Sequence, residues 1–181
     1  MRKFIWSFIE VLETVAIAVI AVVIIRAFVA QPFLVSGSSM EPSFYHGDYL
    51  LIDELSYNFR EPQRGEVVVF RDPSEGKSYF IKRVIGLPGE RIVIDESGVS
   101  IGKDDESFIL QEDYVLESRT IRHYEVALED DEYFVMGDNR GFSFDSRNWG
   151  PLRGDDISGV ARLRLWPISR VKAIGTPDYQ Y

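Results

Sequence analysis

The sequence predicts an all-β fold, built mainly of antiparallel sheets, that follows one N-terminal transmembrane helix. Short runs rich in Val, Ile, Phe and Tyr alternate with Gly and Pro turns after Pro32. No long helical pattern interrupts these runs, and the one long apolar stretch lies before them. The 181 residues fit one domain with an appendage, which we assign to residues 32–181 and 1–31 respectively.

The apolar stretch Phe4–Ala30 has the length needed to cross a bilayer. About 20 mostly apolar residues span the hydrocarbon, and the few charged residues of this stretch would lie toward the two interfaces. Arg2 and Lys3 precede it, so the positive-inside rule predicts a cytoplasmic N-terminus and an outer location for everything after about residue 31. We therefore expect a single-pass protein of the cytoplasmic (inner) membrane, with the lipid bilayer as a partner.

Three other interpretations of this stretch compete with an uncleaved anchor. A cleaved signal peptide has small residues at both positions of an Ala-x-Ala-like site, whereas cuts after Ala27 or Ala30 would put Ile25 or Phe28 at the earlier position. A buried core helix is rarely this long and this rich in β-branched residues. An interfacial helix has a polar face, whereas this run is apolar all round.

Eight segments of the remaining chain have the composition of strands. β-branched and aromatic residues dominate the clearest of them, such as Val67–Phe70. Arg162 and Arg164 alternate with Leu163 and Leu165, which is typical of a half-buried strand. The predicted strands are Phe33–Ser36, Tyr49–Ser56, Glu66–Arg71, Ser78–Ile85, Arg91–Ile94, Gly98–Ile101, Glu132–Met136 and Ile157–Trp166.

The chain is acidic, with 20 Lys and Arg against 29 Asp and Glu, a net charge of -9 and a pI near 4.8. A nucleic-acid partner bound through a broad cationic face is therefore not expected. Residues 104–132 hold eleven acids and two bases, Arg119 and Arg122, and account for the whole imbalance. We interpret this acidic segment as a solvated surface insertion; the alternative is a docking site for a basic partner.

The chain contains no cysteine and only two histidines, His46 and His123. Disulfides, thiolate catalysis and Cys-ligated zinc are therefore excluded, and no HExxH motif or histidine cluster is present. We predict neither a metal nor a cofactor. A Ser-His-Asp triad also lacks its base, since neither histidine sits in a catalytic motif.

Three polar segments are candidates for a reactive site. The first runs Val35-Ser36-Gly37-Ser38-Ser39-Met40-Glu41-Pro42-Ser43 and ends a predicted strand in small residues, which let a backbone approach a ligand closely. By composition alone, a flexible turn between the anchor and the domain is the better explanation of this segment.

The second segment, Tyr79–Glu90, contains a lysine inside an apolar strand. Alternation puts Phe80, Lys82 and Val84 on one face. Burial lowers the pKa of a lysine from about 10.4 by up to several units, and a neutral lysine can take a proton from a serine. Lowering the pKa by two units costs about 2.7 kcal/mol, which a domain tolerates. The alternative is an edge-strand lysine that prevents aggregation.

The third segment, Gly137–Gly150, packs two Asp, two Arg and two Ser into a loop bounded by glycines. An exposed loop with weak ion pairs is the alternative. The density of short polar groups beside the apolar strand Glu132–Met136 favours a site.

These three segments, in this order and behind an N-terminal apolar stretch, resemble bacterial type I signal peptidases. The stretches that carry the resemblance are Ser39-Met40-x-Pro42, Arg64-Gly65-Glu66-Val67-Val68, Lys82-Arg83-Val84-Ile85-Gly86-Leu87-Pro88-Gly89 and Gly137-Asp138-Asn139-Arg140-x-x-Ser143-x-Asp145-Ser146-Arg147. Each motif is moderately specific, and the ordered set is highly specific. The acidic segment matches nothing in the family.

The resemblance implies a membrane-bound serine endopeptidase that removes signal peptides from exported preproteins through a Ser–Lys dyad and an acyl-enzyme. Ser39 would be the nucleophile and Lys82 its general base, with Ser143 hydrogen-bonded to the lysine amine. The ion-pairing braces would be Asp138, Arg140, Asp145 and Arg147. The substrate-binding residues would be Leu34, Val35, Ser36, Met40, Phe80 and Ile81, of which Leu34–Ser36 would pair with an extended substrate.

One position departs from the family. Some relatives have a serine hydroxyl donor two residues before the nucleophile, where this chain has Gly37. The Ser39 backbone N–H is one expected donor to the oxyanion. The second donor stays open among Ser36, Ser38 and the backbone.

Two rival functions remain. A self-cleaving repressor-type protein shares Ser–Lys chemistry but would be soluble and carry a DNA-binding segment. An anchored β domain that binds peptides with an inactive dyad is the second, and the joint presence of Ser39, Lys82 and Ser143 disfavours it. The sequence does not indicate an oligomeric state or the preferred preproteins.

Overall fold

The computed structural model describes residue 6 and residues 9–20, 30–73, 76–103, 106–115, 123–177 and 179. One group of strands contains β1 (Ala30–Leu34), β2 (Tyr49–Asp53), β3 (Val67–Arg71), β4 (Tyr79–Gly86), β9 (Glu132–Met136), β10 (Leu152–Arg153), β11 (Ile157–Trp166) and β12 (Lys172–Ala173). A second group contains β5 (Arg91–Asp95), β6 (Gly98–Lys103), β7 (Glu106–Ile109) and β8 (Tyr124–Ala127). The short helical segments are η1 (Ser56–Asn58), α2 (Ser146–Trp149), η2 (Gly154–Asp156) and η3 (Ile168–Arg170).

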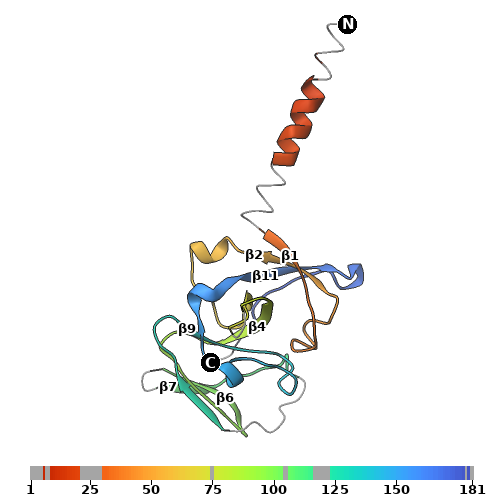
Figure 1. Ribbon diagram of the computed structural model, residues 1–181. Coiled ribbons are helices and arrows are strands. Elements are labelled where there is room, and N and C mark those ends of the chain that lie inside the picture. Colours follow the sequence, from red (N-terminus) through yellow and green to blue (C-terminus); the bar gives the residue numbers. More distant parts are fainter. Residues whose placement is uncertain are drawn as a thin grey trace.

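These strands form two sheets in the described part of the chain (Figure 1). The larger sheet has eight strands in the order β1-β2-β11-β3-β4-β9-β10, with β12 paired to β11. The smaller sheet has the order β7-β6-β5-β8. Neighbouring strands pair antiparallel in both sheets. The prediction of a mainly antiparallel β domain is confirmed.

Strand β3 lies in the middle of the larger sheet and is buried on both faces. Val67 and Val69 belong to one apolar cluster, and Val68 and Phe70 belong to another. A strand covered on both sides needs an unbroken apolar run rather than an alternating one, which explains the sequence Val-Val-Val-Phe. The first cluster also contains residues of β1, β2 and β11, so the sheet curves around a common core.

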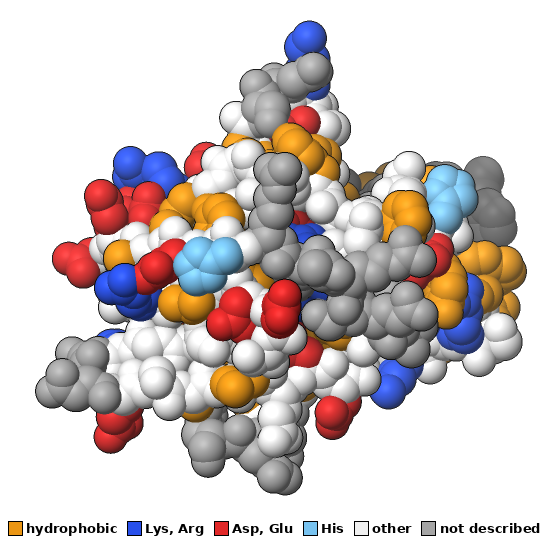
Figure 2. Space-filling view, turned by 90° about the horizontal axis from the view of Figure 1, so that it is seen from below, with side chains coloured by type: hydrophobic (Ala, Val, Ile, Leu, Met, Phe, Trp, Pro, Cys, Tyr) orange, Lys and Arg blue, Asp and Glu red, His pale blue; other side chains and the backbone are white. Residues whose placement is uncertain are grey.

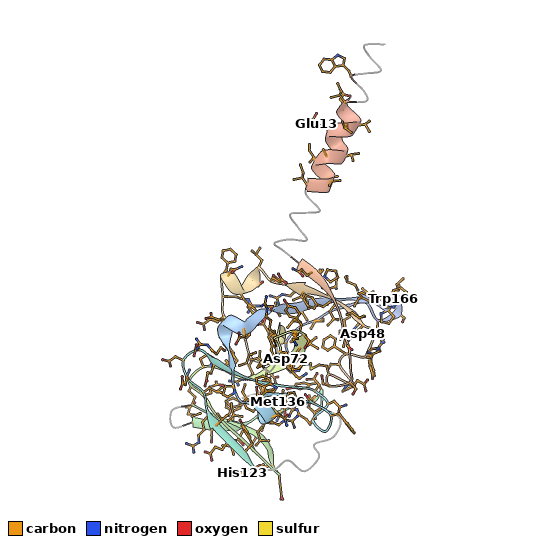
Figure 3. All side chains as sticks on the ribbon, viewed as in Figure 1. Glu13, Asp48, Asp72, His123, Met136 and Trp166 are labelled. Atoms are coloured by element: carbon orange, nitrogen blue, oxygen red, sulfur yellow. The ribbon has the colours of Figure 1, made fainter. Side chains whose placement is uncertain are left out.

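A third apolar cluster joins the two sheets. Ile85 and Met136 come from the larger sheet, and Ile92 and Ile101 come from the smaller one. Met136 lies inside the body of the molecule in Figure 3, whereas His123 lies at its margin. The smaller sheet is therefore packed onto the end of β4 and β9, next to the loop that follows β9.

The acidic segment 104–132 is not only a solvated insertion, and this prediction was wrong in part. Strand β7 pairs with β6, strand β8 pairs with β5, and Leu110 and Leu128 are buried in the third cluster. Both strands are outer strands of the smaller sheet, so acidic residues such as Glu125 face water while Phe108 and Val126 pack inward. Acidic and basic side chains are interspersed over the face seen in Figure 2. Asp104, Asp105, Glu117 and both bases of this segment, Arg119 and Arg122, lie outside the described residues.

Only part of the predicted anchor is described. Residues 9–20 are helical, and their side chains are exposed. No helix within the described residues is both long enough and apolar enough to cross a bilayer. The rest of the predicted span, residues 4–5, 7–8 and 21–29, lies outside the described residues, as do Arg2 and Lys3.

Strand boundaries differ from the prediction mostly at ends. Strand β1 begins at Ala30, before the predicted domain boundary, because Pro32 is tolerated on an edge strand where its missing N–H is not needed. Strand β11 spans the predicted residues, but Leu165 and Trp166 at its end are exposed. Strands β7, β8, β10 and β12 were not predicted.

Candidate active site

A groove with a volume of about 410 Å³ opens between the end of β1 and the first half of β4. Strand β1 is the edge of the larger sheet, and β4 pairs with β9 only from Arg83 onward. Tyr79–Ile81 therefore pair with β3 on one side and border the groove on the other. Two strand edges facing one groove form a binding site suited to an extended peptide.

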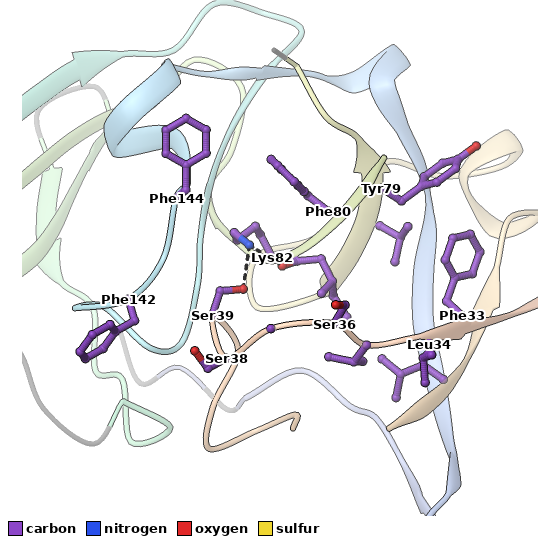
Figure 4. Close-up of a pocket in the computed structure, with 15 residues that line it drawn as sticks. Phe33, Leu34, Ser36, Ser38, Ser39, Tyr79, Phe80, Lys82, Phe142 and Phe144 are labelled. Carbon is purple, nitrogen blue, oxygen red and sulfur yellow. Dashed lines mark hydrogen bonds between the residues drawn. The ribbon is translucent and has the colours of Figure 1, made fainter. Parts of the chain in front are cut away.

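Ser39 and Lys82 meet at the floor of this groove, although 43 residues separate them in sequence. The Lys82 Nζ lies 2.9 Å from the Ser39 Oγ and donates a further hydrogen bond of 3.0 Å to the carbonyl oxygen of Ile81 (Figure 4). The Phe80 ring lies 5.4 Å from the amine. No salt bridge to Lys82 is recorded within the described residues, and its side chain is buried. The predicted pair is therefore within hydrogen-bond distance.

Burial lowers the pKa of the Lys82 amine from its ordinary 10.5 to about 8. The negative charges of Asp145 and Asp138 act in the opposite direction, and the positive charge of Arg147 adds to the lowering. Burial outweighs the two carboxylates because each carboxylate is neutralised by an arginine. About one amine in ten is then neutral at pH 7, which suits a general base.

Asp145 holds together the loop that follows β9. Its carboxylate accepts hydrogen bonds from the Gly137 backbone N–H at 3.0 Å and from Arg147 Nε and Nη2, both at 2.8 Å. It also caps the N-terminus of α2 by accepting from the Arg147 backbone N–H. Burial alone would raise the pKa of this carboxyl, but the hydrogen bonds and charge of Arg147 hold it below the ordinary value. Asp145 and Arg147 form an ion pair, and their role as a brace of the site stays a prediction.

The loop is joined directly to the backbone of the serine. The Asn139 backbone N–H donates to the Ser39 carbonyl oxygen at 3.0 Å, and the Asn139 side chain donates to the Ser38 carbonyl oxygen at 3.1 Å. Gly137 allows this close approach, since a Cβ there would lie only 2.4 Å from the Ser39 carbonyl oxygen and 2.2 Å from the Ser143 Oγ. The loop therefore sets the position of the nucleophile.

Asp138 and Arg140 do not pair with each other. Asp138 accepts two hydrogen bonds from Arg83, at 2.8 Å from Nε and 2.6 Å from Nη2, and both side chains are buried. Arg140 forms a bidentate pair with Glu112, which belongs to the acidic segment. The ion pairs expected among Asp138, Arg140, Asp145 and Arg147 therefore include two further residues, Arg83 and Glu112.

Glu112 is part of a partly buried polar cluster that also includes Tyr179, near the C-terminus. The Tyr114 hydroxyl donates to Glu112 at 2.7 Å and lies 3.0 Å from the Tyr179 hydroxyl. Burial raises the pKa of Tyr114, so this phenol stays protonated and able to donate. The Arg83 guanidinium lies over the Tyr114 ring, 4.1 Å from its centroid. The acidic segment and the C-terminal part thus both contact the ion pairs behind the groove.

Ser143 does not make the predicted hydrogen bond to Lys82 in this structure. Its Oγ is fully buried and has no hydrogen-bond partner of good geometry among the described residues, although it lies close enough to Asp145 to stabilise that carboxylate. Lys82 donates to Ser39 and Ile81 instead. A buried, unpaired hydroxyl crowded against Gly137 is still available as an acceptor.

Five of the six predicted substrate-binding residues line the groove: Leu34, Val35, Ser36, Phe80 and Ile81. Met40 does not, because its side chain is only 1% exposed and packs in the core cluster beneath the serine. Sequence analysis missed four aromatic lining residues, which are Phe33, Tyr79, Phe142 and Phe144. Phe33 and Tyr79 flank predicted residues, whereas no pattern indicated the other two. No group of His, Asp and Glu side chains gathers as a metal site within the described ranges.

Comparison with known proteins identifies the relatives of this chain. Residues 8–166 match the family described as "Signal peptidase, peptidase S26". The "Probable signal peptidase I-2" of Synechocystis sp. is 39% identical over 171 residues, which cover 91% of this chain and 76% of that protein. The "Signal peptidase I P" of Bacillus subtilis subsp. natto is 32% identical over 181 residues, covering 92% of this chain and 93% of that protein.

A crystal structure of a signal peptidase I from Enterococcus faecalis V583 also aligns with the chain. The alignment has 29% identity and a TM-score of 0.47, and it covers 56% of this chain and 97% of that one.

Proposed function

This chain belongs to the signal peptidase family, peptidase S26, whose activity is the removal of signal peptides by a serine peptidase, and we propose that Ser39 is its nucleophile and Lys82 its general base. The observation that carries this assignment is the 2.9 Å contact between the serine hydroxyl and a buried lysine that forms no salt bridge with any carboxylate among the described residues. The substrates are preproteins that carry signal peptides.

The reaction begins when the neutral amine of Lys82 takes the hydroxyl proton of Ser39. The Oγ bonds to the carbonyl carbon of the scissile peptide, and the carbonyl oxygen becomes an oxyanion. As the C–N bond breaks, the ammonium gives its proton to the leaving nitrogen, and an ester remains on Ser39. Lys82 then deprotonates a water molecule, whose oxygen bonds to the ester carbon, and the proton returns to Oγ as the ester breaks.

The oxyanion needs hydrogen-bond donors aimed at its position. The Ser39 backbone N–H is the first donor in this proposal. The Gly37 backbone N–H already donates to the His46 ring at 3.3 Å, which favours a hydroxyl of Ser36 or Ser38 as the second. The positive φ of Gly37 turns the chain between the end of β1 and Ser39. Ser36 and Ser38 lie on either side of this turn, and both line the groove.

The residues before the scissile bond bind in the extended conformation between Leu34–Ser36 and Tyr79–Ile81. Both segments have a strand edge at the groove, so backbone hydrogen bonds would supply affinity and the side-chain pockets would supply specificity. Most residues that line the groove are apolar, Val35 and Ile81 among them. Small side chains, as in Ala-x-Ala endings, fit such pockets best.

Ser143 is the positioning group for the amine in this mechanism. Protonated Lys82 has three N–H donors, of which Ser39 and Ile81 accept two. The buried, unpaired Ser143 hydroxyl supports its role as the third acceptor. A third acceptor would hold the amine in line with Ser39 while it carries the proton.

Residues 4–30 anchor the enzyme in the cytoplasmic membrane, with the N-terminal end inside and the β domain outside. Anchoring confines enzyme and preprotein to one bilayer and raises their effective concentration. Extraction of membranes with alkaline carbonate tests this part, since the full chain should stay with the lipid. External protease should cut the β domain in intact spheroplasts. Release by carbonate, or complete protection from protease, would contradict the proposed topology.

The catalytic assignment is tested with the purified full chain in detergent and a preprotein that carries a signal peptide. Ser39→Ala and Lys82→Met should each lower kcat/KM by at least about a thousandfold. Ser100→Ala on β6 and Lys172→Met on β12 are matched controls that should leave turnover unchanged, since both lie outside the groove. Turnover by Ser39→Ala at the rate of the unmodified chain would refute the assignment.

A further inference from the structure

The loop after β9 exposes two large aromatic side chains. Phe142 is 68% exposed and Phe144 is 54% exposed, whereas the side chains of Asp138, Arg140 and Asp145 in the same loop are buried. Phenyl rings contribute a large apolar area, which is available here for contact with a ligand. Both rings line the groove that contains Ser39 and Lys82.

The backbone on either side of these rings is firmly held. Before them, Asn139 donates to the Ser39 carbonyl oxygen, and the Phe142 backbone N–H donates to the Asn139 carbonyl oxygen, each at 3.0 Å. After them, Asp145 is bound by Gly137 and Arg147. Attachment on both sides keeps the backbone that carries the two rings next to the nucleophile, as a specificity element requires.

The rings lie across the dyad from the rest of the groove. In Figure 4, Ser39 and Lys82 separate Phe142 and Phe144 from the part of the groove lined by Phe33, Leu34 and Tyr79. Under the proposed function, that part of the groove binds the residues before the scissile bond. A polypeptide is continuous through the reacting carbonyl, so the residues after the bond must leave on the side where the two rings lie.

We propose that Phe142 and Phe144 bind the first two residues of the mature chain, those that follow the scissile bond, and favour apolar side chains at these positions. This inference rests on the proposed function and adds a second specificity element to it. The rings offer apolar area and no hydrogen-bonding group, so an apolar side chain gains by burial against them. An acidic side chain there would lose water without gaining a partner and is therefore disfavoured.

Two preproteins test this inference, identical except for the first two residues after the scissile bond, which are Leu-Leu in one and Ala-Ala in the other. The unmodified chain should process the Leu-Leu substrate with a kcat/KM about tenfold higher. Phe142→Ala/Phe144→Ala should bring the ratio close to one, mainly by lowering kcat/KM for the Leu-Leu substrate. Phe59→Ala, which removes another exposed phenyl ring outside the groove, should keep the full ratio.

An unchanged ratio in the double variant would overturn the inference. An equal loss on both substrates would also overturn it, because the rings would then support the loop rather than contact the substrate. Thermal unfolding of the double variant and of Phe59→Ala, run side by side, detects misfolding as the cause of such a loss. Ser39→Ala is included throughout, and if it processes both substrates as well as the unmodified chain does, the proposed function fails and this inference fails with it.

Discussion

Lys82 and Arg83 are neighbours in β4, and each is only 4% exposed, yet they lie in opposite environments. Lys82 faces the groove and contacts a hydroxyl, a carbonyl oxygen and a phenyl ring. Arg83 faces the other side and is bound by both oxygens of Asp138 and by the Gly65 carbonyl oxygen. A guanidinium stays charged even when it is buried, so Arg83 depends on its carboxylate partner. A buried ammonium without such a partner loses its proton easily and is available for chemistry.

The largest effect on stability should come from removing Asp138, the carboxylate partner of Arg83. Asp138→Asn leaves a buried guanidinium without its counter-charge and should lower the free energy of unfolding by about 3–5 kcal/mol. Asp138 also raises the pKa of Lys82, so the acid limb of the kcat/KM profile should move to lower pH in this variant. Chemical denaturation and a pH profile measure the two effects.

Asp131→Asn is the control for that experiment, since Asp131 forms an exposed pair with Arg153. Its free energy of unfolding should change by less than about 0.5 kcal/mol. If the two variants were equally stable, Arg83 would not depend on Asp138 in the way the contacts indicate.

A second prediction concerns stability on the Lys82 side. The pKa of Lys82 is about 8 in the folded chain and 10.5 ordinarily, so the folded state holds fewer protons than the unfolded state between these pH values. Stability contributed by this group therefore rises with pH from 8 to 10.5, and below pH 8 the buried charge carries its full cost. Lys82→Met removes that cost and should stabilise the inactive protein by up to about 3 kcal/mol at pH 7.

The gain in stability from Lys82→Met should shrink above pH 8 and disappear near pH 10.5. Urea denaturation of both proteins at pH 7 and pH 10 measures it, with Lys172→Met as the exposed control. A Lys82→Met variant that is less stable than the parent at pH 7 would mean that the hydrogen bonds of the amine outweigh the cost of burying it.

Loss of Arg147, the second arginine near the groove, should have a smaller effect, on the pKa of Lys82. The charge of Arg147 lowers the pKa of Lys82 and neutralises Asp145, so Arg147→Met should raise that pKa. The acid limb of the kcat/KM profile should then move to higher pH by about half a unit to one unit. Arg153→Met should leave the limb in place, and a shift of the Arg147→Met limb to lower pH would reverse the assigned electrostatics.

Local patterns were enough to predict the strands of the buried centre. The run Val67–Phe70 and the strand Glu132–Met136 are rich in β-branched and aromatic residues because both faces of these strands are covered. Strands β7 and β8 were missed because Glu106–Ile109 and Tyr124–Ala127 are short, mixed in polarity and half exposed. These segments become strands because they pair with β6 and β5, and such pairing is not visible in the local sequence pattern.

The active site likewise contains residues that a local sequence pattern indicates and residues that only the folded structure brings together. Ser39 and Lys82 were found because ordered motifs surround them, and the sequence could indicate a lysine in an apolar strand. Arg83 was overlooked as a partner of Asp138 although it stands next to Lys82. Glu112 had no signal, since its partner Arg140 is 28 residues away. Phe142 and Phe144 lie in an irregular loop without periodicity, so only the folded loop reveals that they line the groove.

The central claim concerns the protonation of one amine, and a titration measures it directly. The chain has five lysines, so NMR of protein labelled with ¹⁵N at the lysine side chains in detergent gives few signals, and Lys82→Met identifies the one that belongs to Lys82. We predict that this signal titrates with a pKa of about 8. A pKa of Lys82 near 10.5 would contradict its role as the general base.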